Sequence, residues 1–346
     1  MSAARLVIGS RGSTLALAQA EAVAAGLRAA HPDLEIAITT VATTGDRLLD
    51  VPLAKIGDKG LFTKELETAL LDGRIDLAVH SAKDVPTALP AGLALAAFTR
   101  REDARDVFVA TPGARRPAGP RALPAGARIG SSSLRRRAQL LALRPDLRVV
   151  DLRGNVETRL RKLADDGLDG TVLAAAGLAR LGRADVAAFT FSFDEMLPAV
   201  GQGALAVETR AGDESVAALV AGLNDGPTAL AVRAERALLA ALEGGCQVPL
   251  GAHAELATGS AEAAAGSAAL VAGLGGRASS GEGAELLLRA FVGTLDGGET
   301  VRDTLRAPAD EPEALGEALA ERLRAAGAGR ILAALRDTAV TPGSAR

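Results

Sequence analysis

The sequence predicts an α/β protein in which two lobes enclose a cleft, followed by a small α+β domain. Three observations support this fold class. The chain has 346 residues, 48% of them apolar, which is enough for two or three domains with their own cores. Short apolar runs alternate with segments of helical periodicity, the pattern of βαβ units. This series occurs twice before an apolar strand leads back, so two crossings between the lobes would form a hinge beside the cleft.

The first series begins at the N-terminal end. A strand is expected at Arg5–Ser10, and Thr14–Ala30 has the apolar spacing of a helix. A strand, an amphipathic helix and a further strand follow at Glu35–Ala42, Leu61–Leu71 and Ile75–Val79. Between them, the polar stretch Gly45–Gly60, which contains Lys55 and Lys59, is either a mobile lid or an ordinary surface loop.

A charged segment, Arg100–Asp103, and a surface loop rich in Pro, Arg and Gly, Thr111–Gly126, separate the two series. The second series then repeats the order of the first. Its expected strands and helices alternate along Arg128–Ser131, Leu134–Leu143, Arg148–Leu152, Val156–Ala164 and Thr171–Ala175. Ala204–Val207 is a further apolar strand, which we place back in the first lobe.

The C-terminal part predicts the small α+β domain. It contains a strong helix with proline at its start, a low-complexity stretch, a pair of strands and an amphipathic helix, at Pro227–Leu242, Thr258–Gly283, Leu286–Val292 with Thr300–Leu305, and Pro312–Ala325. We therefore divide the chain into domain 1 (residues 1–99 and 204–221), domain 2 (105–197) and domain 3 (222–346).

Composition argues against several classes of function. The net charge of −3 and the pI near 5.8 are not those of a general nucleic-acid binder or of a protein that binds anionic membranes. No apolar run is long enough to span a bilayer, and the N-terminal residues lack the pattern of a signal peptide. One cysteine and three histidines offer no metal-ligand cluster. These features predict a cytoplasmic protein without a metal.

Cys246 is the only cysteine and lies in the loop Leu242–Gly251. A single thiol cannot form an internal disulfide. Two glycines precede it and Pro249 follows it, which predicts a fixed turn that presents the sulfur as a nucleophile or an attachment point. The alternative is a buried cysteine that serves as a small apolar residue.

Positive charge is concentrated in the second lobe. Residues 128–161 contain nine arginines against three acidic residues, in a chain whose net charge is negative. Guanidinium groups bind carboxylates and phosphates through paired hydrogen bonds, so the cluster predicts a small polyanionic ligand rather than a solvated helix face. Ser131–Ser133 and Arg153–Asn155 each precede a predicted helix, where an anion is favoured.

Asp84 is the candidate catalytic residue. It lies in the segment His80–Pro86 at the carboxyl end of a predicted strand, where open α/β sheets bind ligands. A carboxylate beside Lys83 and near arginines should stay ionised, and would stabilise positive charge that develops on a substrate. The alternative is an aspartate in an ordinary turn. We interpret His80 as a core residue with its hydrogen bonds satisfied.

Seven segments, taken in order, make the chain similar to the porphobilinogen deaminase family, also called hydroxymethylbilane synthase. They are Gly9–Ser13, Gly57–Phe62, His80–Pro86, Ser132–Arg136, Leu152–Asn155, Pro198–Gly203 and Glu243–Pro249. The resemblance implies two lobes like type II periplasmic binding proteins, a third domain, and a transferase of porphyrin and haem (tetrapyrrole) biosynthesis. Such an enzyme joins four porphobilinogen molecules head to tail on a covalent dipyrromethane cofactor, releases ammonia, and frees hydroxymethylbilane by hydrolysis.

The resemblance also implies residue roles. Cys246 matches the cysteine that attaches the cofactor through a thioether, and Asp84 matches the catalytic carboxylate. The cofactor contacts fall on Ser81, Lys83, Ser133, Arg135 and Arg136. The contacts to the substrate and growing chain fall on Arg11, Ser13, Gln19, Phe62, Arg153, Arg159 and Arg180. Lys55 and Lys59 match the active-site lid. Porphobilinogen is the expected partner, without nucleic acid or membrane, and the enzyme is expected to be a monomer.

The sequence departs from the family's pattern at a few places. Ala82 stands where methionine is usual and Gly12 where a larger polar residue is usual, and the Thr111–Gly126 and Thr258–Gly283 stretches look enlarged. A solute-binding protein of the same two-lobed fold is one alternative function, but it would have no use for the Gly-Gly-Cys loop. A nucleic-acid-binding regulator is another, and the absence of Trp and Tyr and the acidic total weigh against it.

Overall fold

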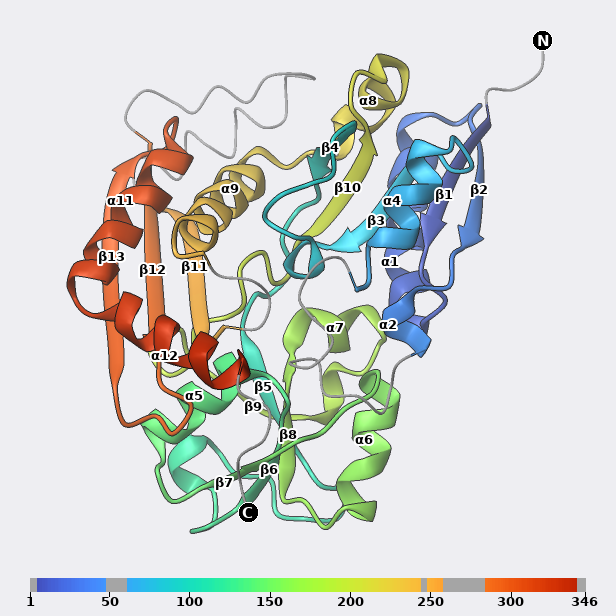
Figure 1. Ribbon diagram of the computed structural model, residues 1–346. Coiled ribbons are helices and arrows are strands. Elements are labelled where there is room, and N and C mark those ends of the chain that lie inside the picture. Colours follow the sequence, from blue (N-terminus) through green and yellow to red (C-terminus); the bar gives the residue numbers. More distant parts are fainter. Residues whose placement is uncertain (1–4, 48–60, 244–247, 258–283, 341–346) are drawn as a thin grey trace.

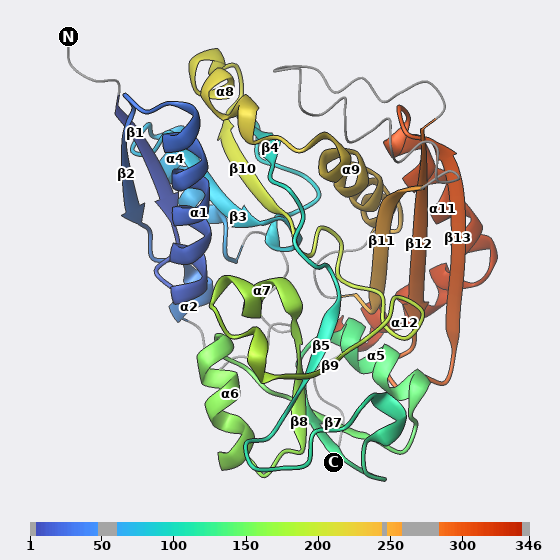
Figure 2. The ribbon, with the colours of Figure 1, turned by 180° about the vertical axis from the view of Figure 1, so that it is seen from behind.

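The computed structural model describes residues 5–47, 61–243, 248–257 and 284–340. Its chain forms two α/β lobes and a third unit that lies alongside both of them (Figure 1). The view from behind shows that the second lobe is built from one stretch of chain, whereas β10 joins the first lobe from far along the sequence (Figure 2). Both views agree with the predicted fold class of two lobes and a small α+β unit.

The first lobe contains a five-stranded sheet in the order β2-β1-β3-β10-β4. β1, β2 and β3 are parallel, while β10 runs antiparallel to both of its neighbours, β3 and β4. The strands are β1 (Arg5–Ser10), β2 (Glu35–Thr40), β3 (Leu77–Ser81), β4 (Leu93–Phe98) and β10 (Leu205–Arg210). The helices are α1 (Thr14–Ala30), α2 (Thr44–Arg47), α4 (Lys64–Leu71) and α8 (Glu214–Val220), and Val216 and Val220 of α8 are part of the buried core of this lobe. The predicted return of the chain to this lobe is thus confirmed.

The second lobe repeats this arrangement, with a sheet in the order β7-β6-β8-β5-β9. β5, which enters from the first lobe, occupies the position that β10 holds in the other sheet and is likewise antiparallel to both neighbours. The strands are β5 (Asp106–Ala110), β6 (Arg128–Gly130), β7 (Arg148–Val150), β8 (Gly170–Ala174) and β9 (Ala187–Thr190). The helices are α5 (Leu134–Leu143), α6 (Val156–Asp165) and α7 (Ala175–Arg180).

Helices α1, α5 and α6 each begin with a side-chain cap. Ser13, Ser133 and Asn155 precede α1, α5 and α6, and each side chain accepts a hydrogen bond from a backbone N–H of the first turn. Such a cap typically contributes about 1 kcal/mol of stability. The caps fix where the helices start, and therefore which backbone and side-chain donors stand at the edge of each sheet.

The third unit packs helices on one face of an antiparallel sheet, β11-β12-β13. Its strands are β11 (Leu250–Ala257), β12 (Glu285–Gly293) and β13 (Thr300–Pro308), and its helices are α9 (Gly226–Ala241), α11 (Pro312–Ala325) and α12 (Ala328–Val340). A Cβ at Gly316 of α11 would lie 2.4 Å from the Ala234 carbonyl oxygen of α9. The glycine therefore permits the close contact of these two helices.

Most predicted elements are present, with shifted ends. β3 begins at Leu77 rather than Ile75, and α4 begins at Lys64 rather than Leu61. The sequence did not predict several elements, which include β5, β9, β11, α7, α8 and α12. β5 was missed because Asp106 and the charged residues before it made the run look like a loop. In the described residues no single helix is long and apolar enough to cross a membrane, although Glu214–Leu223 and Gly226–Ala241 pass that test together as a pair bent by 107°.

Candidate functional site

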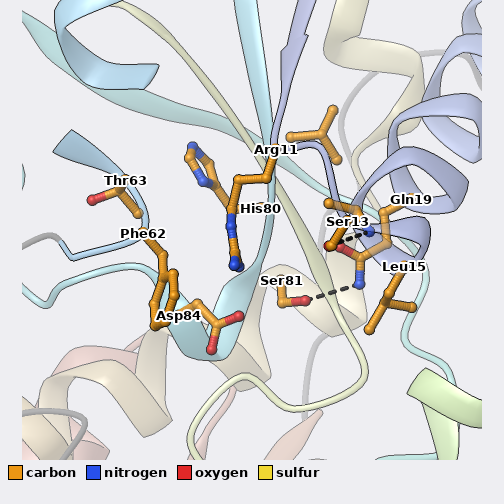
Figure 3. Close-up of a pocket in the computed structure, with 11 residues that line it drawn as sticks. Arg11, Ser13, Leu15, Gln19, Phe62, Thr63, His80, Ser81 and Asp84 are labelled. Atoms are coloured by element: carbon orange, nitrogen blue, oxygen red, sulfur yellow. Dashed lines mark hydrogen bonds between the residues drawn. The ribbon is translucent and has the colours of Figure 1, made fainter. Parts of the chain in front are cut away.

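Asp84 ends the 3-10 turn Ala82–Asp84, which directly follows β3 (Figure 3). Two cavities, of about 60 and 70 Å³, meet at this residue. Leu15, Gln19 and Ser81 also line both cavities. Among the described residues none donates a hydrogen bond to the Asp84 carboxylate, so the backbone on either side sets its position.

The first cavity lies within the first lobe and contains four of the predicted substrate contacts. The Arg11 guanidinium carbon lies 4.2 Å from the centre of the Phe62 ring, a cation–π contact. Gln19 Nε2 donates to Ser81 Oγ at 2.9 Å, and Ser13 caps α1 (Figure 3). An aromatic face, a cation and polar groups thus surround the Asp84 carboxylate.

The second cavity lies between the lobes. It is lined by Lys83 and Asp84 of the first lobe, by α7 of the second, and by Gln202 and Gly203 of the chain crossing. Arg180, at the end of α7, donates through Nη2 to the Gly203 carbonyl oxygen at 2.5 Å. Burial lowers the pKa of Arg180, and the nearby Glu102 opposes that change. The predicted residues Lys83 and Arg180 are therefore brought together from different lobes.

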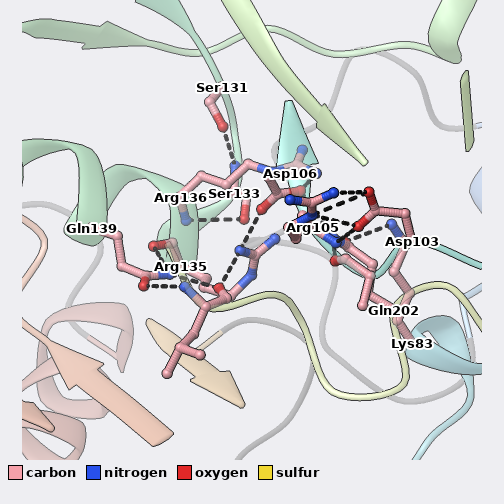
Figure 4. A network of polar contacts seen from close by, with 12 residues as sticks. Lys83, Asp103, Arg105, Asp106, Ser131, Ser133, Arg135, Arg136, Gln139 and Gln202 are labelled. Carbon is pink, nitrogen blue, oxygen red and sulfur yellow. Dashed lines mark hydrogen bonds and ion pairs between the residues drawn. The ribbon is translucent and has the colours of Figure 1, made fainter. Parts of the chain in front are cut away.

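A buried ion cluster lies at the start of β5 and is centred on Asp106 (Figure 4). Its two carboxylate oxygens accept hydrogen bonds from Arg135 Nη1 and Arg136 Nη2, each at 2.7 Å. Arg135 Nη1 also donates to the Leu197 carbonyl oxygen at 2.8 Å. Burial alone would raise the pKa of Asp106, but the two guanidinium groups outweigh it and hold that pKa well below its usual range. Arg135 and Arg136, two of the predicted cofactor contacts, thus already share a counter-ion within the protein.

Gln202 connects this cluster to the turn that ends at Asp84. Its Nε2 donates to Asp106 Oδ1 at 3.0 Å and to the Ala104 carbonyl oxygen at 2.7 Å, while its Oε1 accepts from Lys83 Nζ at 3.3 Å (Figure 4). Burial lowers the pKa of Lys83 to about 8, against the opposing effect of Asp84. Lys83 therefore stands between a carboxylate in the cavity and a carboxylate in the core.

The sequence reasoning missed Asp106 and Gln202 as site residues. The available signal for Gln202 was its position between Gly201 and Gly203, whose φ angles of 71° and 95° allow the tight turn that aims the amide inward. The signal for Asp106 was a single acid directly before the apolar run Val107–Val109. This pattern is typical of a buried strand whose first residue has a polar role.

Several arginine nitrogens of the second lobe are buried without a hydrogen-bond partner in the described part of the chain. They are Nε of Arg136, Nε of Arg137 and Nη1 of Arg153. Arg159 donates through Nε to the Gly154 carbonyl oxygen at 2.8 Å. Burial, followed by the positive charges of Arg136 and Arg153, lowers the pKa of Arg159 to about 10. This region therefore carries buried positive charge that an anion would stabilise.

The prediction for His80 is confirmed, because its Nε2 lies 2.9 Å from Glu208 Oε2 in the core of the first lobe. Within the described residues no group of three or more His, Cys, Asp or Glu side chains could hold a metal ion. Cys246, Lys55 and Lys59 lie outside the described residues. So do residues 48–60 of the Gly45–Gly60 stretch and the whole of Thr258–Gly283.

Comparison with known proteins gives matches along almost the whole chain. The family model described as porphobilinogen deaminase, dipyromethane cofactor binding domain, matches residues 6–218, and the model of the porphobilinogen deaminase C-terminal domain matches residues 229–325. The porphobilinogen deaminase of Syntrophotalea carbinolica is 52% identical over 342 residues, which cover 99% of both chains. That of Moorella thermoacetica is 52% identical over 325 residues, or 94% of this chain and 95% of its own.

Solved structures are more distant. The periplasmic VFT2 domain of BvgS from Bordetella pertussis is 16% identical with a TM-score of 0.37, and the match covers 64% of this chain and 86% of that domain. The alkanesulfonate-binding protein SsuA from Xanthomonas axonopodis is 17% identical with a TM-score of 0.34, covering 68% and 74%. The two family models and the full-length relatives place the chain in the porphobilinogen deaminase family.

Proposed function

We propose that this transferase performs the full reaction of its family with Asp84 as the catalytic carboxylate: four porphobilinogen molecules are joined head to tail, ammonia is released, and hydroxymethylbilane is freed by hydrolysis. The observation that carries the assignment of Asp84 is its position where two cavities meet. One cavity offers a cation and an aromatic face, and the other is lined by Lys83 and by Arg180 of the second lobe.

The residues present fit a dipyrromethane cofactor. Each of its pyrroles carries acetate and propionate groups, so it brings several carboxylates into the cleft. The second lobe offers buried guanidinium nitrogens on Arg136 and Arg153 that have no partner among the described residues, and the first lobe offers Lys83 with its lowered pKa. Carboxylates are the groups that satisfy such donors and neutralise such charges. Arg136, Lys83 and Ser133 would hold the cofactor, and Arg135 would support Arg136 through their common partner Asp106.

When bound, the dipyrromethane supplies the pyrrole position to which the first substrate unit is joined. The Asp84 carboxylate lies where positive charge develops as ammonia leaves a substrate, and a fixed negative charge there stabilises that state more than the ground state. Arg11 and Phe62 orient the incoming ring and its acid groups, with Ser13 and Gln19 completing the wall. Arg153, Arg159 and Arg180 hold the carboxylates of units already added.

The test of Asp84 is Asp84→Asn, which removes a charge and almost no volume. We expect turnover to fall at least about 10²-fold, because a preorganised electrostatic group is lost, while the fold and the cofactor are retained. Circular dichroism, intact mass and single-turnover kinetics measure the three quantities. Activity within about threefold of the unsubstituted enzyme would assign the charge stabilisation to another group.

We propose Cys246 as the residue that holds the cofactor through a thioether, on the basis of its match to the family's Gly-Gly-Cys loop. The purified protein should then be heavier than its sequence by two pyrrole units. Cys246→Ser should lose both this excess mass and all turnover. Active protein with the unmodified mass would contradict the assignment.

The same proposal extends to the surroundings of the site. Lys55 and Lys59 would belong to a lid over the cleft, the three domains would have the ranges given above, and the enzyme would act as a cytoplasmic monomer. The lone cysteine is in keeping with a reducing compartment. Light scattering after size-exclusion chromatography should give the mass of one chain at all concentrations, and limited proteolysis should cut near the proposed boundaries.

A further inference from the structure

One arginine of the third unit contacts the loop that directly follows Asp84. Arg236, on α9, donates through Nη1 to the Val85 carbonyl oxygen at 3.1 Å. Its Nη2 donates to the carbonyl oxygens of Pro86 at 2.6 Å and of Thr87 at 3.2 Å. A single guanidinium group therefore binds three successive backbone carbonyls, beginning one residue after the proposed catalytic carboxylate.

These carbonyls need a donor from elsewhere. Residues 85–87 belong to no strand or helix, and Pro86 has no backbone N–H of its own. Only the Val85 N–H closes the turn, onto the Ala82 carbonyl oxygen at 3.3 Å. Five fixed donors in one plane make arginine suited to bind several carbonyls at once, whereas lysine offers a single centre.

Packing on the same face of α9 supports this contact. Val232 lies one helical turn before Arg236 and belongs to the buried cluster that contains Ala82 and Val85. The catalytic turn is thus flanked by an apolar contact at Val232 and a polar one at Arg236. Both come from the helix that leads toward the Cys246 loop.

The helix itself is fixed in rotation by the neighbouring residue. Glu235 is fully buried and accepts hydrogen bonds at 2.7 Å from Arg101 Nη1, from the Gly201 N–H and from the Ala254 N–H. Arg101 and Gly201 lie in the two segments that connect the lobes, before β5 and before β10, and Ala254 lies in β11. Because α9 is held on this side, the guanidinium of Arg236 has a defined position from which to hold the loop.

We propose that Arg236 is a positioning residue for Asp84: it holds the 85–87 backbone and thereby fixes the carboxylate, which receives no hydrogen bond from another described residue. This inference rests on the proposed catalytic role of Asp84. A displacement of about 1 Å at a reacting group can cost roughly 10²-fold in rate, so the contact acts on turnover although Arg236 does not line either cavity.

The experiment is a double-mutant cycle on the holoenzyme with Arg236→Met, Asp84→Asn and the combination. Arg236→Met keeps the apolar part of the side chain and removes the donors. We expect its kcat to fall by about 10- to 100-fold, with KM within about threefold and with the cofactor mass retained. In the Asp84→Asn background the same substitution should cost less than about threefold, measured by single-turnover mass spectrometry, because the group it positions is already disabled.

Arg233→Met is the matched control. Arg233 lies on the same helix and forms an exposed ion pair with Glu313, so its loss should leave kcat and KM unchanged. Arg236→Lys should recover part of the kcat lost in Arg236→Met. If the methionine variant does not fold, the double-mutant cycle is measured with Arg236→Lys instead.

Three results would overturn the proposal: an unchanged kcat, an equal loss in both backgrounds, or loss of the cofactor instead of turnover. Asp84→Asn measured alone separates these from a failure of the proposed function. If that variant is fully active, the catalytic assignment fails; if it is inactive but the cycle is additive, only the role of Arg236 fails.

Discussion

Two groups of arginines in the second lobe differ in what neutralises them. Arg135 and Arg136, at the start of α5, share the buried carboxylate of Asp106. Arg153 and Arg159, around the start of α6, form no ion pair with an acid among the described residues. Arg159 donates to a backbone carbonyl, and Arg153 leaves a buried nitrogen without a partner in the same part of the chain. Within the described residues, the first group is paired with an acid and the second is not.

This difference separates a structural use of buried charge from a ligand-binding use. A buried charge with its counter-ion in place helps to hold the lobe, and its removal leaves the partner uncompensated. A buried charge without one is costly until an anion arrives. We therefore expect the loss of Asp106 to act first on stability, and substitutions at Arg153 and Arg159 to act first on ligand binding.

The largest effect is expected for Asp106→Asn. Removing one partner of a buried charge cluster typically costs about 3–5 kcal/mol, here because Arg135 and Arg136 would lose their common carboxylate. Urea unfolding followed by circular dichroism should give a lower midpoint. Asp103→Asn is the control, since its ion pair with Arg105 is exposed and worth at most about 1 kcal/mol. Equal midpoints for the two variants would remove the distinction between the groups.

The stabilising effect of Asp106 should also depend on pH. Its pKa in the folded protein lies below that of an unfolded aspartate, so its contribution is present above a pH of about 4 and is lost as the pH falls below that value. Acid titration of the unfolding midpoint in the parent protein and in Asp106→Asn measures this. The two curves should converge on the acid side, and parallel curves down to low pH would contradict the assignment.

A smaller effect, on binding, is expected for Arg153→Leu and Arg159→Leu. Each lost charge-assisted contact is worth roughly 1.5–3 kcal/mol, or about 10- to 150-fold in affinity. Both variants should contain cofactor but show raised KM or stall with partly extended chains, which mass spectrometry after mixing with porphobilinogen resolves. Arg135→Leu and Arg136→Leu should instead yield mainly apoprotein. Identical cofactor content and chain lengths in both groups would show that the arginines act as one patch.

The smallest effect concerns Lys83. Because its pKa is lowered to about 8, its charge in the ligand-free protein is lost as the pH rises through that value, and its affinity for carboxylates should fall with it. The free energy of unfolding should rise with pH between about pH 8 and 10.5, because in this range the unfolded chain keeps the Lys83 proton that the folded protein has lost. Lys83→Arg should remove the decline in cofactor assembly above pH 8, followed by intact mass of apoprotein given porphobilinogen. An unchanged decline would exclude Lys83 as its cause.

The sequence predicted the parts of the fold that have local signals. The helix over Thr14–Ala30 was predicted with its bounds, because an N-cap serine and a regular apolar spacing define it. Helix α7 was missed because Ala175–Arg180 has only six residues and no side-chain cap. β5 was missed because its first residue is a charged aspartate, whose burial depends on arginines from another segment.

The candidate site divides in the same way. Asp84 and several residues that line its cavities, among them Arg11 and Phe62, lie in motifs that are continuous in the chain. The roles of Asp106, Gln202 and Arg236 could not be predicted, since each acts through a contact with a segment that is distant in sequence. Such pairings become visible only once the crossings between lobes are placed.

The position of β10 has a consequence for how the chain reaches its native state. The first lobe cannot complete its sheet until β10 inserts between β3 and β4, and the buried pair His80–Glu208 joins residues 128 positions apart. All five strands of the second lobe lie within residues 106–190, so that lobe needs nothing from later in the chain for its sheet. During synthesis we therefore expect the second lobe to become ordered before β10 has joined the sheet of the first lobe, because contacts distant in sequence form slowly. Pulsed hydrogen exchange during refolding should then protect β6 and β8 before β1 and β3, and the reverse order would refute this sequence of events.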